Sequence, residues 1–268
     1  MKNGFFVIDS HCHIYPQKIA EKAIENTDNF YSTHSVGSGI VENLAKHHNS
    51  VDLFLVQSVA TTAKQVKSIN EFIASSIKGN SKFVGLGTMY PDSLTIEEDF
   101  EHLKSLGLNG IKMHPDIQKF AVDDDRMKKI YSLASKSNIP VLLHTGDNRY
   151  DYSNPNRLIP VLKEFPNLTF IGAHFGGYTL WEEAAKQLKD IPNLYVDCSS
   201  SFAVIGKDRG KKLIEMYTPD KVLFGSDYPM YYPENDLETI FSMGFSSSEL
   251  KKILSENAKK VYKLQCFE

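Results

Sequence analysis

Short apolar runs alternate with amphipathic segments along almost the whole chain. Eight runs have the continuous apolar pattern of buried strands, at 5–8, 51–56, 83–89, 110–114, 139–144, 168–174, 194–198 and 222–227. The segments between them place apolar residues at helical spacing. Most runs follow one another at intervals of about 26 to 32 residues, which is the size of a strand–helix–strand unit. The pattern therefore predicts a regular alternation of strands and helices.

Helix boundaries are marked by local signals. The pattern predicts helices at about 63–77, 95–106, 124–137, 155–164, 180–188, 206–216 and 246–264. Thr95 with Glu98 and Ser246 with Glu249 have the spacing of capping boxes. Segments 16–27 and 37–47 are helical or loop-like, and the longer first interval indicates an insertion between 15 and 50.

The alternation determines the expected fold class. Continuous apolar strands separated by amphipathic helices indicate a parallel sheet that is covered by helices. Eight such units fit an α/β (β/α)8 TIM barrel better than an open sheet. No glycine-rich phosphate loop follows the first strand, and no linker is visible. We expect one domain over residues 1–268.

Composition narrows the function classes. The 268 residues are 41% hydrophobic and 24% charged, with a net charge of −3, which favours neither nucleic-acid nor membrane-surface binding. Cys12, Cys198 and Cys266 are few and far apart, which fits a reducing compartment better than a disulfide framework. No run is long enough for a signal-peptide core or a membrane span. We expect a soluble cytoplasmic protein.

Chemistry-bearing residues gather where the predicted strands end. His11 and His13 end the first strand and face the same way by alternation. Later strand ends carry five more such residues: Lys112, His114, His144, His174 and Asp227. Active sites of (β/α)8 barrels form at this edge, and several imidazoles with a carboxylate are a usual ligand set for a divalent metal. The pattern predicts a metal site in the barrel mouth.

Five motifs resemble those of the amidohydrolase superfamily. They are Ile-Asp-Ser-His-Cys-His (8–13), Gly-Ile-Lys-Met-His-Pro (110–115), Leu-His-Thr-Gly (143–146), Ala-His-Phe-Gly-Gly (173–177) and Phe-Gly-Ser-Asp-Tyr-Pro (224–229). The chain is most similar to the amidohydrolase-2 branch, which includes the aminocarboxymuconate-semialdehyde decarboxylase-like enzymes. The resemblance covers essentially the whole chain.

The resemblance implies a role for each residue. His11, His13 and His144 would bind one metal, expected to be zinc, with Asp227 as a further ligand or as the base on a metal-bound water. His174 would lie just outside the metal shell and contact the water or the substrate. A metal held in this way lowers the pKa of bound water towards about 7. Asp227 or His174 would then take and return the proton.

Lys112 leaves the number of metals open. Binuclear relatives use a carbamylated lysine from the fourth strand to bridge two metals, whereas the amidohydrolase-2 branch uses a single metal. We favour one metal, with Lys112 and His114 in the substrate pocket. Arg149 is a further candidate substrate contact, because arginine binds carboxylates through two hydrogen bonds.

Several functions remain open at this stage. Hydrolysis of a small-molecule C–N or C–O bond by a metal-activated water is the first expectation, and non-oxidative decarboxylation of a small carboxylic acid is the alternative. A TatD-like deoxyribonuclease is less favoured, because its glutamate pattern on the fourth strand is absent. A non-catalytic metal-binding protein is also less favoured, since the ligand set is intact. A homodimer is a family-level expectation.

Overall fold

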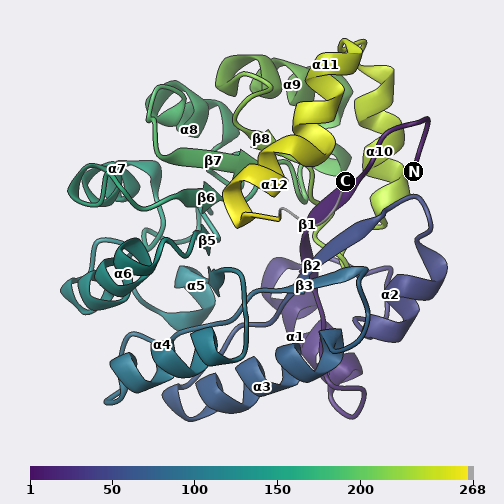
Figure 1. The fold of residues 1–268 in the computed structure, drawn as a ribbon. Coiled ribbons are helices and arrows are strands. Elements are labelled where there is room, and N and C mark those ends of the chain that lie inside the picture. The colour runs from purple at the N-terminus through teal and green to yellow at the C-terminus, as the bar shows by residue number, and fades with distance from the viewer. Residues whose placement is uncertain (265–268) are drawn as a thin grey trace.

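The chain folds as an α/β barrel with helices around the outside, and the computed structural model describes residues 1–264 (Figure 1). The last four residues of the predicted 1–268 domain, including Cys266, lie outside the described residues. The described strands are β1 (Ile8–His13), β2 (Leu53–Gln57), β3 (Phe83–Gly85), β4 (Ile111–Met113), β5 (Val141–Leu143), β6 (Phe170–Gly172), β7 (Leu194–Asp197) and β8 (Val222–Leu223). The predicted fold class is confirmed.

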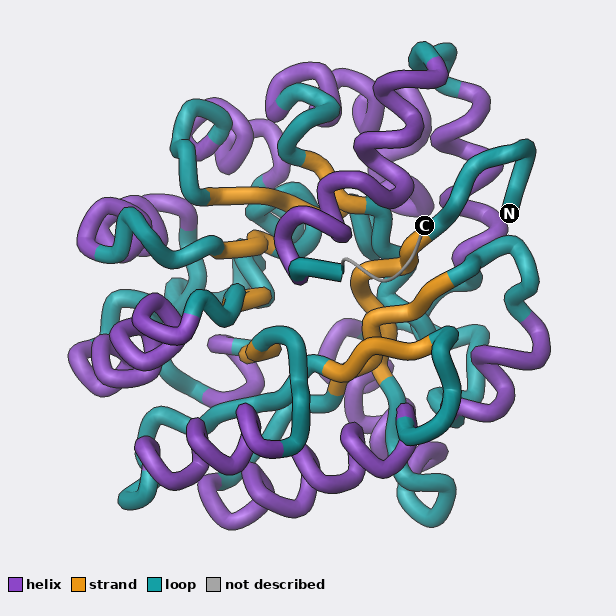
Figure 2. The backbone as a smooth tube through the Cα atoms, viewed as in Figure 1, coloured by secondary structure: helices purple, strands orange, loops and turns teal. Residues whose placement is uncertain are grey.

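Every pair of adjacent strands is parallel, in the order β1-β2-β3 and β4-β5-β6-β7-β8 (Figure 2). Parallel bridges connect the two groups on both sides, between Gly87 and Ile111 and between Cys12 and Tyr228. The backbone N–H of Asp227 also donates to the carbonyl of His11 at 2.9 Å. The strand order is therefore that of the sequence, and the first and last strands lie side by side.

The first strand differs from its predicted range. The apolar run predicts a strand at 5–8 with the histidines following at its end, but β1 begins at Ile8 and itself extends to His13. The reason is backbone pairing beyond the apolar run, since the N–H of His13 donates to Tyr228 and that of Ile14 to Gln57. His11 and His13 thus lie on a strand that is hydrogen-bonded on both sides, which fixes their direction.

Helices follow the strands and cover the barrel from outside. The helical segments are α1 (Ala20–Tyr31), α2 (Val41–His47), η1 (Ala63–Gln65), α3 (Val66–Ile77), α4 (Ile96–Ser105), α5 (Pro115–Gln118), α6 (Asp125–Ser137), α7 (Pro155–Glu164), α8 (Trp181–Leu188), α9 (Phe202–Tyr217), α10 (Pro233–Ser242), α11 (Ser247–Lys251), η2 (Lys252–Glu256) and α12 (Asn257–Tyr262). The alternating pattern predicted most of these segments.

Some helix predictions were wrong in detail. The pattern did not predict α5 or α10, and the helix predicted at 206–216 begins at Phe202 with a break at Gly206, where φ is +76°. The predicted helix at 246–264 is divided by a π-helical turn, η2. The Ser246 capping box is confirmed, whereas Thr95 makes no capping hydrogen bond, because its hydroxyl turns to Asp99.

The hydrophobic core has two parts. The larger part lies between the strands and the surrounding helices, and the smaller part fills the inside of the barrel. In the smaller part, Ala258, Val261 and Tyr262 of α12 pack against inward-facing strand residues such as Ile8 and Leu142. Figure 1 shows α12 lying across the strands. One end of the barrel is therefore filled by apolar packing, and the other end is left for polar groups.

None of the helices within residues 1–264 is both long enough and apolar enough to cross a membrane.

Candidate metal centre

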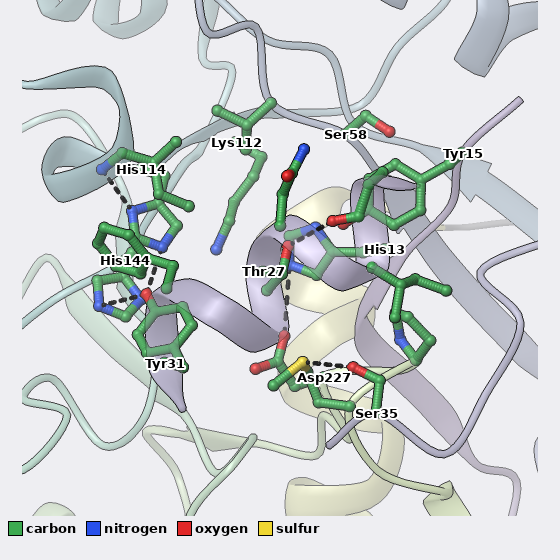
Figure 3. Close-up of a pocket in the computed structure, with 18 of the residues that line it drawn as sticks. His13, Tyr15, Thr27, Tyr31, Ser35, Ser58, Lys112, His114, His144 and Asp227 are labelled. Atoms are coloured by element: carbon green, nitrogen blue, oxygen red, sulfur yellow. Dashed lines mark hydrogen bonds and ion pairs between the residues drawn. The ribbon is translucent and has the colours of Figure 1, made fainter. Parts of the chain in front are cut away.

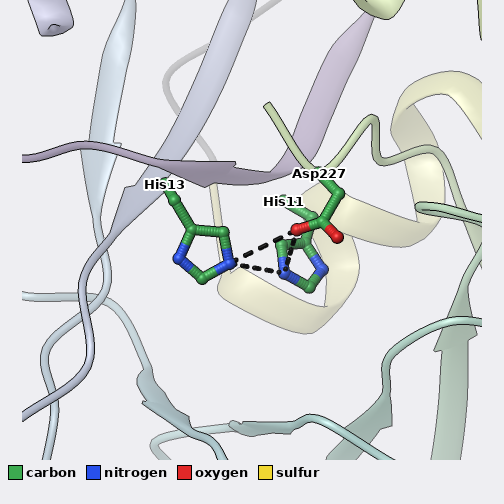
Figure 4. A group of neighbouring side chains, drawn as sticks. All are labelled: His11, His13 and Asp227. Atoms are coloured by element: carbon green, nitrogen blue, oxygen red, sulfur yellow. Dashed lines mark hydrogen bonds and ion pairs between the residues drawn. The ribbon is translucent and has the colours of Figure 1, made fainter. Parts of the chain in front are cut away.

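Three predicted ligands meet at the open end of the barrel (Figure 4). The Nε2 atoms of His11 and His13 are 3.2 Å apart, and Asp227 Oδ1 lies 3.2 Å from the first and 3.3 Å from the second. Both histidines come from β1 and the aspartate follows β8, so the two neighbouring strands bring them together. Two imidazole nitrogens and one carboxylate oxygen thus converge on one small volume.

Hydrogen bonds behind His11 fix the orientation and the tautomer of its imidazole ring. Its Nδ1 donates to Asp197 Oδ2 at 2.9 Å, and Asp197 in turn accepts from the Ser199 hydroxyl. The proton is therefore on Nδ1 and the lone pair on Nε2, which faces Asp227. Burial lowers the pKa of His11 to about 4, with the nearby Lys112 ammonium adding to the effect. The ring is neutral, which a metal ligand requires.

Asp227 is held as a carboxylate in this cluster. The Ser200 hydroxyl donates to Oδ2 at 2.5 Å and leaves Oδ1 for the histidines. Burial alone would raise its pKa, but the neighbouring rings of His11, His13 and His174 outweigh that effect and hold the pKa well below the usual range. An ionised carboxylate is thus present beside the imidazoles of His11 and His13.

This donor set fits a divalent metal. The three ligand atoms lie within 4.8 Å of one another. A carboxylate hydrogen-bonded behind a ligating histidine is the usual second layer of such sites, because it fixes the tautomer and increases the basicity of the ring. The protein offers three ligands at this position and leaves room for substrate or water, as catalytic rather than structural sites do.

His144 and His174 form a pair beside this group. His174 Nδ1 lies 2.9 Å from the backbone carbonyl of Ser199 and donates to it, so its Nε2 carries the lone pair. His144 Nδ1 lies 3.1 Å from that Nε2 and donates to it. His144, predicted as the third imidazole ligand, therefore contacts His174 and is not within the close group of His11, His13 and Asp227.

His114, Asp116 and His144 also lie close enough together to be considered as ligands. However, the rings of His114 and His144 are stacked at 4.0 Å, and His114 Nδ1 accepts from the N–H of Ile117. The proton of His114 is therefore on Nε2, 2.6 Å from the Tyr31 hydroxyl. Burial raises the pKa of Asp116 to about 7, so this carboxyl is partly protonated at neutral pH. The group of His11, His13 and Asp227 therefore presents its lone pairs to a metal better than the group of His114, Asp116 and His144 does.

Lys112 brings a positive charge to the site. Its Nζ lies 3.1 Å from His11 Nε2, and the side chain is buried. Burial lowers its pKa to about 8, so the amine is mostly an ammonium at neutral pH. Within residues 1–264, no carboxylate oxygen lies within ion-pair distance of this nitrogen. Lys112 is thus a buried cation that has no ion-pair partner among the described residues.

A cavity of about 650 Å³ opens above these residues (Figure 3). Seven predicted site residues line it: His11, His13, Lys112, His114, His144, His174 and Asp227. Figure 3 shows Lys112 pointing into the space between Asp227 and the stacked pair of histidines. The structure therefore brings nearly all of the predicted site residues to one cavity.

Arg149 lies outside the cavity lining as far as the described residues show. Its guanidinium donates to both oxygens of the buried Asp147 and, at 2.5 Å, to the carbonyl of Phe30. It also lies over the ring of Phe30 at 4.9 Å. In this structure Arg149 holds the C-terminal end of α1, whereas the sequence suggested that it contacts the substrate.

Two residues of the site were not predicted. Tyr31, at the end of α1, places its hydroxyl 2.6 Å from His114 and 3.4 Å from His144. Nothing in the sequence marks it, because it lies in the insertion after the first strand. Asp197 ends β7 and supports His11. Its position at the end of a predicted strand could have marked Asp197 as a candidate site residue, but the sequence prediction considered mainly the histidines.

The chain matches one family over nearly its whole length. The family model for amidohydrolases (Amidohydro_2) covers residues 8–264.

Solved structures with the same fold include both uncharacterised proteins and enzymes. An uncharacterised TIM-barrel protein, Bb4693 from Bordetella bronchiseptica, is 19% identical with a TM-score of 0.79, over 97% of this chain and 99% of that one. The 5-carboxyvanillate decarboxylase LigW from Sphingomonas paucimobilis is 16% identical with a TM-score of 0.73, over 97% and 99%. A dihydroxybenzoic acid decarboxylase from Polaromonas sp. JS666, with bound manganese and an inhibitor, is 14% identical with a TM-score of 0.72, over 98% of both chains. At identities of 14% to 19%, these similarities show that the fold is shared and show no more than that.

Proposed function

The chain belongs to the amidohydrolase family, and from this premise we propose that it is a metal-dependent decarboxylase that removes CO2 from a small carboxylic acid. The family and the ligand geometry together support a metal-dependent enzyme. Hydrolysis was the first expectation from the sequence, and nothing in the comparisons supports it specifically. Decarboxylation was the alternative, and decarboxylases are found among proteins of the same fold.

The observation that carries the proposal is the buried ammonium of Lys112. A buried charge without a partner is costly, and a carboxylate substrate would supply the missing partner. The neutral rings of His11 and His13 and the single charge of Asp227 leave the loaded site with an excess of positive charge. Such a site favours an anionic substrate over a neutral amide.

The residues have distinct roles in this proposal. His11, His13 and Asp227 hold the metal, with His144 as the fourth ligand expected from the sequence. When bound, the metal supplies Lewis-acid stabilisation of negative charge on the substrate oxygens. Lys112 binds the substrate carboxylate and His114 lines the cavity beside it.

The reaction breaks the bond between the carboxylate carbon and its neighbour, and that neighbour takes up a proton as CO2 leaves. His174 carries this proton in the proposal, because it lines the cavity and its Nδ1 is fixed on the Ser199 carbonyl, so that its Nε2 takes the proton once His144 Nδ1 turns away from it. Asp227 is the second candidate for this role.

The metal is proposed to be a single divalent ion. Zinc is the first candidate, because imidazole and carboxylate are its ordinary ligands. Manganese is the second, since two of the decarboxylases of the same fold contain it. A carbamylated Lys112 with two metals remains the alternative to a single ion.

The test is turnover in deuterium oxide with the zinc- and the manganese-loaded protein. A panel of aromatic and unsaturated carboxylic acids is compared with a panel of lactones, amides and esters. Decarboxylation releases CO2 and places one deuterium on the carbon that lost it, which mass spectrometry detects. Hydrolysis adds the elements of water and leaves that carbon unlabelled. Turnover of the second panel without release of CO2 from the first would refute the proposal.

A further inference from the structure

The cavity is large compared with the polar cluster at its base. Its volume of about 650 Å³ lies within the usual range for binding sites of drug-sized ligands. His13, Lys112, His144 and Asp227 surround only part of it (Figure 3). A carboxylic acid built on a single ring would leave much of the remaining space to water.

Apolar side chains from two helices line part of the cavity. They are Ile24 of α1 and Ile69 and Phe72 of α3, and Ile117 and Met230 add to this apolar lining. Ile69 and Phe72 also pack against the core, so α3 holds this surface in place. Water in contact with such a surface is displaced favourably by an apolar ligand.

Several polar side chains of the cavity lining are already hydrogen-bonded within the protein. Four hydroxyl groups donate to other protein groups: Thr27 to Ala23, Ser35 to Asp28, Ser58 to Ile14 and Ser68 to Gln65. Because their hydrogens are engaged, these four groups offer few donors to a polar substituent on the ligand. This part of the lining is therefore less polar than its residue types suggest.

The charges are confined to the part of the cavity beside the metal ligands. Apart from histidines, Lys112 is the single cationic residue among the described residues that line the cavity, and Asp227 is the single acidic one. A second carboxylate on the ligand, away from Lys112, would meet no cationic partner among the described lining residues. The cavity thus accommodates one negative charge and an apolar body.

We propose that the substrate is a monocarboxylic acid whose apolar body is longer than a single ring. The carboxylate lies at Lys112 and the metal ligands, and the body lies between α1 and α3. This inference rests on the proposed function for the role of the site, but it is tested by binding alone.

The experiment measures binding to the metal-loaded protein by calorimetry with three probes. They are benzoate, biphenyl-4-carboxylate and biphenyl-4,4'-dicarboxylate. Biphenyl-4-carboxylate is expected to bind at least tenfold more tightly than benzoate, and the dicarboxylate at least tenfold more weakly than biphenyl-4-carboxylate. Equal affinity for benzoate and biphenyl-4-carboxylate, or tight binding of the dicarboxylate, would overturn the inference.

Two variants test where the apolar body of the bound acid lies. Ile24→Asn and Ile69→Asn are expected to weaken biphenyl-4-carboxylate binding at least tenfold and to change benzoate binding less than threefold. Leu94→Asn is the matched control, because Leu94 is fully exposed and outside the cavity lining. Thermal melting of each variant verifies folding. An equal loss for both probes in a folded variant would contradict the assigned position of the body.

The outcomes separate the two proposals. Selective binding of biphenyl-4-carboxylate without release of CO2 from any acid would leave this inference standing and remove the decarboxylase. Release of CO2 from single-ring acids without preference for the longer probe would support the decarboxylase and refute the inference about the longer apolar body.

Discussion

At the residue scale, the site depends on how each histidine is held. His11 is fixed by Asp197 and His174 by the carbonyl of Ser199, so each presents one lone pair in a set direction. Burial keeps His11 and His13 neutral. The ligand set is therefore ready for a metal before the metal binds, which reduces the cost of ordering on binding.

Loss of one ligand should remove the metal. We expect one divalent ion per chain by elemental analysis after loading and dialysis, less than a tenth of that in His13→Ala, and full retention in Lys112→Ala. His144→Ala tests the fourth predicted ligand in the same way. His47→Ala is the control, because His47 is exposed and outside this site. Two ions in the native protein and a loss with Lys112 would instead support the carbamylated lysine.

Asp236 of α10 should make stability depend on pH. Burial, with Asp9 and Asp227 nearby, raises its pKa well above the usual range, and its Oδ2 lacks a hydrogen-bond partner among the described residues. A carboxyl whose pKa is raised by folding lowers stability as the pH rises from its unfolded value, about 3.9, through the folded value.

Asp236→Asn removes this ionisation. Urea unfolding should show the variant gaining at least about 1 kcal/mol over the native protein between pH 4 and pH 8, since one pKa unit corresponds to 1.36 kcal/mol. A difference that is the same at both pH values would mean that Asp236 ionises equally in the folded and unfolded chain.

At the scale of elements, α1 matters most to the site. It lies in the insertion after β1, lines the cavity with Ile24 and Tyr31, and is fastened at its C-terminal end by Arg149. A cation at a helix C-terminus also interacts favourably with the exposed carbonyls. The loop after β5 thus holds α1, which lines the cavity, although the two segments are far apart in sequence.

Arg149→Gln should loosen α1. We expect amide hydrogen exchange in residues 20–31 to be at least tenfold faster than in the native protein, because the carbonyl of Phe30 loses the guanidinium donor that ties it to Asp147. Arg126→Gln is a close control, since Arg126 is about as exposed and also pairs with an aspartate two residues earlier. Unchanged exchange in α1 would show that Arg149 does not hold it.

At the scale of the whole molecule, the barrel is filled at one end by α12 and open at the other. Val261, which is 5% exposed, packs inside the barrel with Ile8, Leu53 and Leu142. This packing joins the last described helix to strands from both halves of the barrel. The polar site can then occupy the opposite end without supplying the stability of the fold.

Val261→Ala should therefore destabilise the whole chain. We expect a loss of roughly 2 kcal/mol in urea unfolding, from about 0.8 kcal/mol per buried methylene and a cavity contribution. Val204→Ala is the control: Val204 is 54% exposed, and its truncation should cost less than about 0.5 kcal/mol. Equal effects of the two substitutions would mean that α12 does not close the barrel.

The sequence by itself determined the repeated strand and helix pattern, the barrel, and the residues that gather at its open end. This is because strand and helix periodicities are local, and strand ends in a parallel barrel meet at one edge. The prediction missed α10, although Pro233 and Glu234 are local signals of a helix start. The role of Tyr31 could not be predicted, because it depends on contacts with His114 and His144 that are far away in the sequence.

Only the tertiary structure decided which of the gathered side chains share a centre. It placed His11, His13 and Asp227 together, set His144 against His174, and took Arg149 away from the cavity. Such choices depend on hydrogen bonds between residues more than 100 positions apart, such as His11 with Asp197, and on rotamers that the surrounding packing selects.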